Sequence, residues 1–122
     1  MASVKLGPEP LDLLGVRAGD ANEIAFTLKQ NGVAMDLTNS TVIAQARKVA
    51  TDAVAVIEAD YTAVDETLGK FILTWDGDKV RTMLNGALEF IGVWDLQVIP
   101  TGALGKTVVA GVFKANMDVS RV

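Results

Sequence analysis

The sequence predicts one all-β domain built as a sandwich, and three observations lead to that fold class. Its 122 residues suit a single small domain, because two domains of half this length would each have too small a core. Apolar and polar residues alternate with a period of two along most of the chain, as they do in strands with one buried face. Clusters of Gly, Asn and Asp separate these segments, and no sustained helical period competes with them.

The first ten residues are expected to form an extended arm ahead of the domain. Pro8 and Pro10 fix their own φ angles and bias the residue before each of them toward extended backbone. No period of two places this segment in a sheet, and it contains no apolar stretch of signal-peptide length. We therefore divide the chain into an arm at 1–10 and a β-sandwich at 11–122.

The first half of the domain predicts three strands. Alternation is clearest at 22–29, and a turn follows at Asn31 and Gly32, since both residue types tolerate positive φ. Segments 41–49 and 53–60 have strand composition and are expected to pair with each other. The side chains expected to face inward from the first two strands are Ile24, Phe26, Leu28, Val42, Ala44 and Ala46.

The second half predicts three more strands and one short helix. A strand at 69–75 ends at Asp76-Gly77-Asp78, where either aspartate can cap a helix of one or two turns at 79–84. Strands at 88–99 and 107–117 follow. The inward side chains expected here are Phe71, Leu73, Trp75, Phe90, Trp94, Leu96, Val98, Val109, Phe113 and Ala115. Together the segments indicate an immunoglobulin-like antiparallel β-sandwich of six to eight strands with an extended N-terminal arm.

The composition excludes several kinds of chemistry. The chain has Cys 0 and His 0, which rules out disulfides, thiolate or imidazole zinc sites, cysteine nucleophiles and histidine-based triads. A net charge of -4 argues against a nucleic-acid binder, and the uncharged stretches are far shorter than the roughly 20 residues of a membrane span. We expect a non-enzymatic protein without catalytic residues, metal or cofactor that binds neither nucleic acid nor membrane.

Two motifs with a possible chemical role are better explained by structure. Gly105-Lys106-Thr107 matches the end of a phosphate-binding loop, but Pro100 replaces the first glycine and a strand follows. Asp76-Gly77-Asp78 lacks the further carboxylates of a calcium-binding loop. The carboxylates that could be considered for acid–base catalysis are expected to be solvated, and they are Asp52, Glu58, Asp60, Asp65 and Glu66.

Seven short segments resemble, in the same order along the chain, the landmarks of one known family. They are R-A-G-D at 17–20, E-I-A-F-T-L-K at 23–29, M-D-L-T at 35–38, T-V-I-A-Q-A-R-K at 41–48, G-K-F-I-L-T at 69–74, V-W-D-L-Q at 93–97 and D-V-S-R at 118–121. The family is the immunoglobulin-like N-terminal domain of siphophage upper-baseplate proteins, together with small stand-alone virion proteins of tailed phages. The chain departs from the family pattern at Trp94, where a tyrosine is usual.

The resemblance implies a non-enzymatic building block of a tailed-phage virion, associated with the tail or baseplate and assembled in the host cytoplasm. Its expected partners are other virion proteins and further copies of itself in the particle. A capsid decoration protein of the phage head and a carbohydrate-binding sandwich are the alternatives. The candidate assembly interface lies in the arm and its junction with the domain, at Val4, Lys5, Leu6, Pro8, Pro10 and Leu11.

Overall fold

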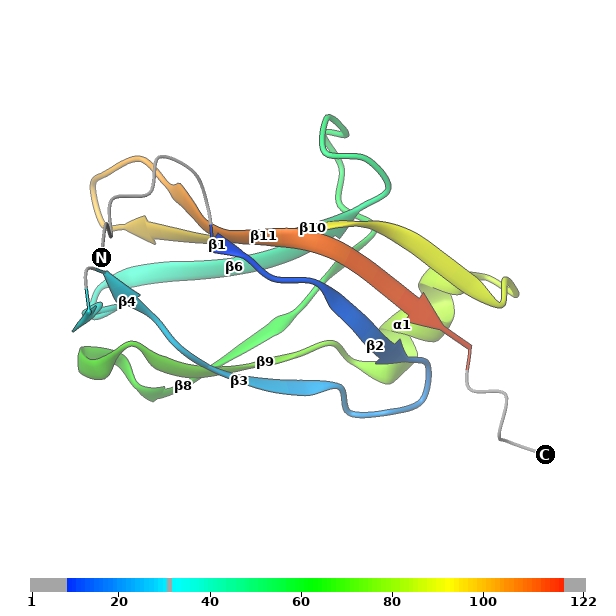
Figure 1. The fold of residues 1–122 in the computed structure, drawn as a ribbon, viewed down its shortest axis with the longest axis horizontal. Coiled ribbons are helices and arrows are strands. Elements are labelled where there is room, and N and C mark those ends of the chain that lie inside the picture. The colour runs from blue at the N-terminus through cyan, green and yellow to red at the C-terminus, as the bar shows by residue number, and fades with distance from the viewer. Residues whose placement is uncertain (1–8, 31, 118–122) are drawn as a thin grey trace.

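Two β-sheets pack face to face in the computed structural model, which describes residues 9–30 and 32–117 (Figure 1). The large sheet has the strand order β1-β11-β10-β6-β7, with β2 also beside β11. Its strands are β1 (Glu9–Pro10), β2 (Leu13–Arg17), β6 (Ser40–Arg47), β7 (Ile57–Glu58), β10 (Glu89–Pro100) and β11 (Lys106–Asn116). This architecture is the all-β sandwich that the sequence predicts.

The small sheet has the order β3-β9-β8. Strands β4 and β5 follow β3 along the chain and form a separate two-stranded hairpin. Their bounds are β3 (Glu23–Thr27), β4 (Lys29–Gln30), β5 (Val33–Ala34), β8 (Asp60–Asp65) and β9 (Lys70–Thr74). The helical segments are η1 (Glu66–Leu68) and α1 (Gly77–Leu84). Seven of the described strands contain five or more residues, within the predicted six to eight, and they are β2, β3, β6 and β8 to β11.

The core lies between the two sheets, where the inward faces predicted from alternation meet. Trp75 follows β9 and Trp94 lies in β10; both are buried, and their rings make an edge-to-face contact with centroids 6.2 Å apart. Phe113 of β11 lies 4.8 Å from Trp75, measured between ring centroids. Such pairs contribute beyond the area they bury, because ring edges and faces carry opposite partial charge. The inward register predicted for β6, β9, β10 and β11 is therefore confirmed.

At the N-terminal edge of the large sheet, the structure differs from two expectations, namely that the arm ends at residue 10 and that all strands are antiparallel. Strands β1 and β2 run parallel to β11, with Glu9 opposite Val109 and Leu13 opposite Phe113. Pro10 is compatible with this position because an edge strand needs only one row of hydrogen bonds. Residues 9 and 10 therefore belong to the sandwich, while residues 1–8 of the arm predicted at 1–10 lie outside the described residues.

A close backbone approach fixes this edge strand between β1 and β2. The Leu11 N–H donates to the Ala110 carbonyl at 3.0 Å, and the Trp94 indole N–H donates to the Leu11 carbonyl at 2.8 Å. Gly111 makes this close approach possible, because a Cβ at this position would collide with the Leu11 carbonyl oxygen. The Asp12 carboxylate accepts a further bond from the Val112 N–H at 2.9 Å. The edge strand is thus tied to the centre of β11.

The strand predicted at 53–60 is much shorter than expected, although its predicted pairing with the strand at 41–49 is present, with Gln45 opposite Glu58 and Ala46 opposite Ile57. Only Ile57 and Glu58 of that segment form β7, residues 48–56 form a loop, and the unpredicted strand β8 begins at Asp60. The loop is held by Arg47, whose Nε donates to the Asp52 carbonyl at 3.0 Å. The period-two composition at 53–60 does not show that the chain leaves the large sheet after Glu58 and joins the small sheet at Asp60.

Helix α1 begins two residues earlier than the predicted start at Lys79. Asp76 is the cap, because its carboxylate accepts a hydrogen bond from the Asp78 N–H at 3.2 Å. The helix buries Val80 and Leu84 at one end of the sandwich. It also forms one wall of the groove described below.

Candidate interaction surfaces

The predicted assembly residues fall partly within the described chain. Pro10 and Leu11 lie at the edge of the large sheet, and the Leu11 side chain is 40% exposed although its backbone is hydrogen-bonded. The remaining four predicted residues lie outside the described residues, and they are Val4, Lys5, Leu6 and Pro8. The structure therefore places only the base of the predicted interface, at an exposed sheet edge.

Sequence reasoning missed an apolar surface on the large sheet. We call it the outer patch and define it as Leu14, Ile91, Val93 and Val112, which face away from the small sheet. Val93 stands opposite Val112 in the β10–β11 ladder, and Leu14 follows the inward-facing Leu13. Leu14, Ile91 and Val112 are 55%, 56% and 38% exposed. The signal was present in β10, because Ile91 and Val93 occupy positions where an exposed strand face normally carries polar side chains.

Two pairs of opposite charges flank the outer patch. Arg47 lies 3.5 Å from Asp95, and Lys114 lies 3.7 Å from Glu89, measured from nitrogen to carboxylate oxygen. The Arg47 guanidinium also donates to Gln45 at 2.8 Å. These charges neutralise one another within the face, so the patch is bordered by compensated rather than single-sign charge.

The loop at 48–56 rises beside this face, on the side away from the small sheet (Figure 1). Val49 and Val54 on the loop are 49% and 77% exposed. Between the loop and the sheet lies a cavity of about 460 Å³. Its lining residues are Pro10, Arg47, Ala50, Val93, Trp94, Asp95, Thr107, Ala110 and Gly111. The outer face is therefore concave, with the sheet as its floor and the loop as one wall.

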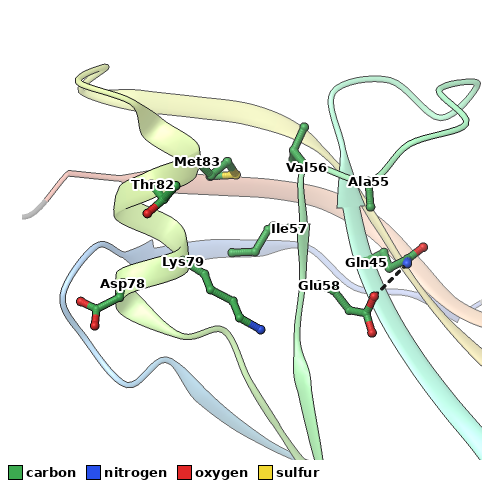
Figure 2. Close-up of a pocket in the computed structure, with 9 residues that line it drawn as sticks. All are labelled: Gln45, Ala55, Val56, Ile57, Glu58, Asp78, Lys79, Thr82 and Met83. Atoms are coloured by element: carbon green, nitrogen blue, oxygen red, sulfur yellow. Dashed lines mark hydrogen bonds between the residues drawn. The ribbon is translucent and has the colours of Figure 1, made fainter.

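A second hollow, a groove of about 640 Å³, lies between α1 and the edge strand β7. Figure 2 shows the side chains that line it, which are Gln45, Ala55, Val56, Ile57, Glu58, Asp78, Lys79, Thr82 and Met83. Its charged groups already have partners within the chain. Glu58 accepts from Gln45 at 3.1 Å, Lys79 pairs with Asp60 at 3.3 Å, and Asp78 pairs with Arg81 at 3.0 Å.

The carboxylates considered for catalysis differ in how far they are buried. Asp52, Glu58 and Asp60 are exposed as expected, whereas Asp65 and Glu66 are half-buried. Glu66 accepts a hydrogen bond from the Tyr61 hydroxyl at 3.4 Å. Partial burial, and secondarily the negative charge of Glu66, raise the pKa of Tyr61. This arrangement stabilises the turn after β8.

The described part of the chain contains no cluster of three or more carboxylates that could hold a metal ion. None of the helices within residues 9–30 and 32–117 is long and apolar enough to cross a bilayer.

Comparison with protein-family models gave no match, and neither did comparison with curated proteins. Among solved structures, the chain is similar to the N-terminal domain of phage TP901-1 ORF48. The two share 10% sequence identity with a TM-score of 0.46, and the alignment covers 91% of this chain and 96% of that chain.

Proposed function

We propose that this chain is a non-enzymatic structural protein of a tailed-phage virion, associated with the tail or baseplate, that acts through protein–protein contacts. The observation that carries the proposal is the ordered set of seven sequence landmarks resembling one virion-protein family. Six of the seven lie in the described part of the chain, and they correspond to strands or to corners between strands. Assembly in the host cytoplasm belongs to the same proposal.

The landmark at 17–20 forms the corner between β2 and β3. Asn22 secures that corner, because its side chain accepts from the Arg17 N–H at 3.0 Å and donates to the Arg17 carbonyl at 2.7 Å. The same Asn22 amide donates to the Trp75 carbonyl at 2.9 Å. Asn22 therefore ties Arg17, the first residue of the landmark, to the residue that follows β9 of the small sheet.

The landmark at 35–38 forms the corner before β6. Leu37 is fully buried there, and the Asp36 carboxylate accepts from the Thr38 N–H at 2.9 Å. Such short-range bonds favour a tight turn. This landmark thus supports the proposal through a buried Leu37 and a hydrogen-bonded turn at the corner before β6.

The surface features favour protein contact over glycan binding. The chain has seven aromatic residues, and none of their side chains is exposed enough to offer a flat stacking platform. Tyr61 and Phe90 are partly buried, and both pack against the core. The outer patch instead offers aliphatic side chains, which suit a protein partner.

Mass spectrometry of purified particles, with heads and tails separated, tests the proposal directly. We expect the chain in the tail fraction of the phage that encodes it. Recovery in the head fraction would favour the capsid decoration alternative. Absence from the particle would contradict a structural role in the virion.

The attachment arm remains part of this proposal, with its boundary moved to the start of β1. A chain beginning at Glu9 keeps the β1 pairing with β11, whereas one beginning at Leu11 would remove it. We expect the Glu9 chain to fold, as judged by circular dichroism, and to enter particles poorly. Undiminished incorporation would refute the arm, and loss of folding would mean that residues 1–8 are needed by the sandwich.

A further inference from the structure

We propose that the free edge of β3 in the small sheet binds the N-terminal segment of a neighbouring copy of this chain, residues 1–8, as an added antiparallel strand. The inference rests on the attachment arm of the proposed function and deepens it, because it names the place where the arm binds. Three observations carry it. Strand β3 is an unprotected edge, its side chains match the segment in one register, and the segment of the same chain cannot reach that register.

Strand β3 is the one long and regular edge among the described strands at the margins of the two sheets. It pairs with β9 over five residues without a register shift. Edge strands are usually short, bulged or interrupted by proline, which prevents further pairing. The other edges have these features: β7 has two residues, β8 has a bulge between Ala63 and Asp65, β1 contains Pro10, and β2 has a register shift.

The ladder between β3 and β9 fixes which backbone groups are used. At one end the Trp75 N–H donates to the Asn22 carbonyl at 3.1 Å, and at the other the Leu28 N–H donates to the Gly69 carbonyl at 2.9 Å. Residues of an antiparallel ladder face the partner strand alternately. The even-numbered residues of β3 therefore direct their N–H and C=O groups toward β9.

The odd-numbered residues Glu23, Ala25 and Thr27 consequently direct their N–H and C=O groups away from β9. Their side chains are exposed, and within the described residues β3 pairs with β9 alone. Such a row of backbone donors and acceptors is the template that an extended peptide uses when it extends a sheet.

The two side chains that β3 directs toward the core are incompletely covered. Ile24 and Phe26 are half-buried and pack against the core. The Phe26 ring stacks on that of Phe71, with centroids 5.3 Å apart. A further strand beside β3 would remove more of both side chains from water, which favours its binding.

One antiparallel register of the N-terminal segment matches this edge. With Lys5 opposite Ala25, the core side of the segment consists of Val4 and Leu6, which lie opposite the two half-buried side chains of β3. Lys5 lies on the outer face, diagonally across from Glu23, where long side chains of opposite charge can meet. Within the described residues Glu23 has no ion-pair partner.

The proline of the segment is compatible with this register. Alternation directs the N–H groups of Ser3, Lys5 and Gly7 toward β3, whereas position 8 faces the other way. Pro8 therefore stands where no donor is needed, as prolines in edge strands do. The alternation from Ser3 to Leu6 is too short to predict a strand by itself, and it acquires this meaning only beside β3.

The segment of the same chain cannot take this register. A strand antiparallel to β3 runs in the direction of β1 and β2, since the corner between β2 and β3 reverses the chain (Figure 1). Glu9 is opposite Val109, two positions before Gly111, which is opposite Trp94. The Trp94 ring lies 6.3 Å from that of Phe26, so β1 is already level with the second half of β3. Residues before Glu9 would therefore continue past the end of β3.

A neighbouring copy has no such restriction, and the segment is long enough. At about 3.3 Å per residue, residues 1–8 could span about 26 Å, which exceeds the length of a five-residue strand.

Disulfide cross-linking tests the register in the full chain, which has no cysteine of its own. Opposite residues in this register have Cα atoms about 5.5 Å apart, a separation that a disulfide bridges. A Lys5→Cys chain mixed with an Ala25→Cys chain should give a linked dimer. The yield should be about tenfold or more above that of Lys5→Cys mixed with Val64→Cys, because binding raises the effective concentration of the thiols. Val64 is the matched control, exposed on the edge strand β8.

Three results of this experiment would overturn the proposal. Equal yields with the two partners would show that the segment does not select β3. Linking of Ala25→Cys chains to one another without the mixed product would show that two β3 edges pair. Linking only when both cysteines are in one chain would show that the segment binds its own sandwich.

Sedimentation equilibrium measures the association itself. Ala25→Pro removes an N–H from the free edge and should raise the dissociation constant by about tenfold or more, because main-chain bonds supply the affinity of an added strand. The matched control is Ala63→Pro on β8, whose N–H also points away from β9 and which should leave the constant unchanged. Circular dichroism checks that both variants fold. A wild-type chain that stays monomeric at about millimolar concentration would overturn the proposal.

Charge reversal provides a second test that does not alter the backbone. Lys5→Glu should weaken association, because it brings a like charge to Glu23. Adding Glu23→Lys to the same chain should restore association. Association that is weakened by the first change and not restored by the second would contradict the register.

The outcome is separable from that of the particle analysis. Linked dimers of a chain that is absent from virions would support the β3 site and contradict its role in the virion. A chain found in tails whose Lys5→Cys and Ala25→Cys forms do not link would support the proposed function and overturn this inference.

Discussion

Trp94 shows how one side chain can join the core to the edge of a sheet. Its ring is buried against Trp75, and its indole N–H holds the Leu11 carbonyl of the N-terminal edge strand. Trp75 is buried equally well, but its indole N–H has no hydrogen-bond partner among the described residues. The two tryptophans therefore differ in polar contacts while sharing the same apolar environment.

This difference predicts unequal costs of substitution. Trp94→Ala should lower the free energy of unfolding by about 3–5 kcal/mol through lost burial and a cavity. Trp94→Phe should destabilise more than Trp75→Phe, because only the former leaves a carbonyl without its donor. Urea denaturation of the variants measures both comparisons. Equal losses for the two Phe variants would show that the bond to Leu11 contributes nothing.

We expect Asp36 to make the folding stability of the protein sensitive to acid. Hydrogen bonds from Thr38, first from its side chain and then from its backbone N–H, hold the pKa of Asp36 below its ordinary value of 3.8. The folded state therefore favours the ionised carboxylate, so this stabilisation is present above pH 3.8 and is lost as the pH falls through the lowered folded-state value. Asp36→Asn should flatten the acid limb of stability against pH. Glu23→Gln, which removes an exposed carboxylate from β3, is the matched control, and an equal flattening there would contradict the assignment to Asp36.

At the scale of elements, the N-terminal edge strand depends on the missing side chain of Gly111. The backbone of Leu11 crosses β11 closely at this residue, between β1 and β2. Strand β11 has β10 along one side, and the short strands β1 and β2, which run parallel to it, along the other side. The parallel edge is held by contacts between the two ends of the chain.

Gly111→Ala should therefore destabilise the protein, by about 1–3 kcal/mol for an overpacked position. The Cβ would meet backbone, which cannot move aside as a flexible side chain can. Gly15→Ala on the same edge is the control, because a Cβ there has no atom within 4 Å. Thermal unfolding of both variants measures the difference. Similar midpoints would mean that the edge strand can shift away from β11 without loss.

At the scale of the whole molecule, charge sets what the protein can approach. The chain carries Lys+Arg 11 against Asp+Glu 15. Several of its cations already pair with carboxylates on the surface, as Arg47, Lys79, Arg81 and Lys114 do. Paired cations release few counterions from a nucleic acid, so little binding energy is available from phosphates.

We accordingly predict no appreciable affinity for duplex DNA at physiological salt. A gel-shift titration with duplex DNA checks this, and binding at low salt alone would be consistent with weak non-specific attraction. Tight binding that weakens steeply as salt rises would contradict the prediction, because it would require a basic surface.

The sequence by itself determined the fold class and the inward face of most long strands. A period of two fixes which side chains share a face, and this holds whichever strand lies alongside, as Leu96 in β10 and Phe71 in β9 show. It also located the helix after β9, since the capping pattern at Asp76 is local. Of the candidate surfaces it found only the edge at Pro10 and Leu11, because alternation predicts burial and says little about contacts made by exposed apolar residues.

Only the tertiary structure decided which strands are neighbours, and with them the outer patch. The Asp12 carboxylate binds the N–H of Val112, a residue 100 positions away, and no local pattern reports such a pair. The sequence also did not show that the chain passes from the large sheet to the small one near Ala59. A segment that changes sheets can have the same residue composition as one continuous strand. Leu14, Val112 and Ile91 become a single surface only when β2, β11 and β10 lie side by side, since packing between distant segments sets the order of strands in a sheet.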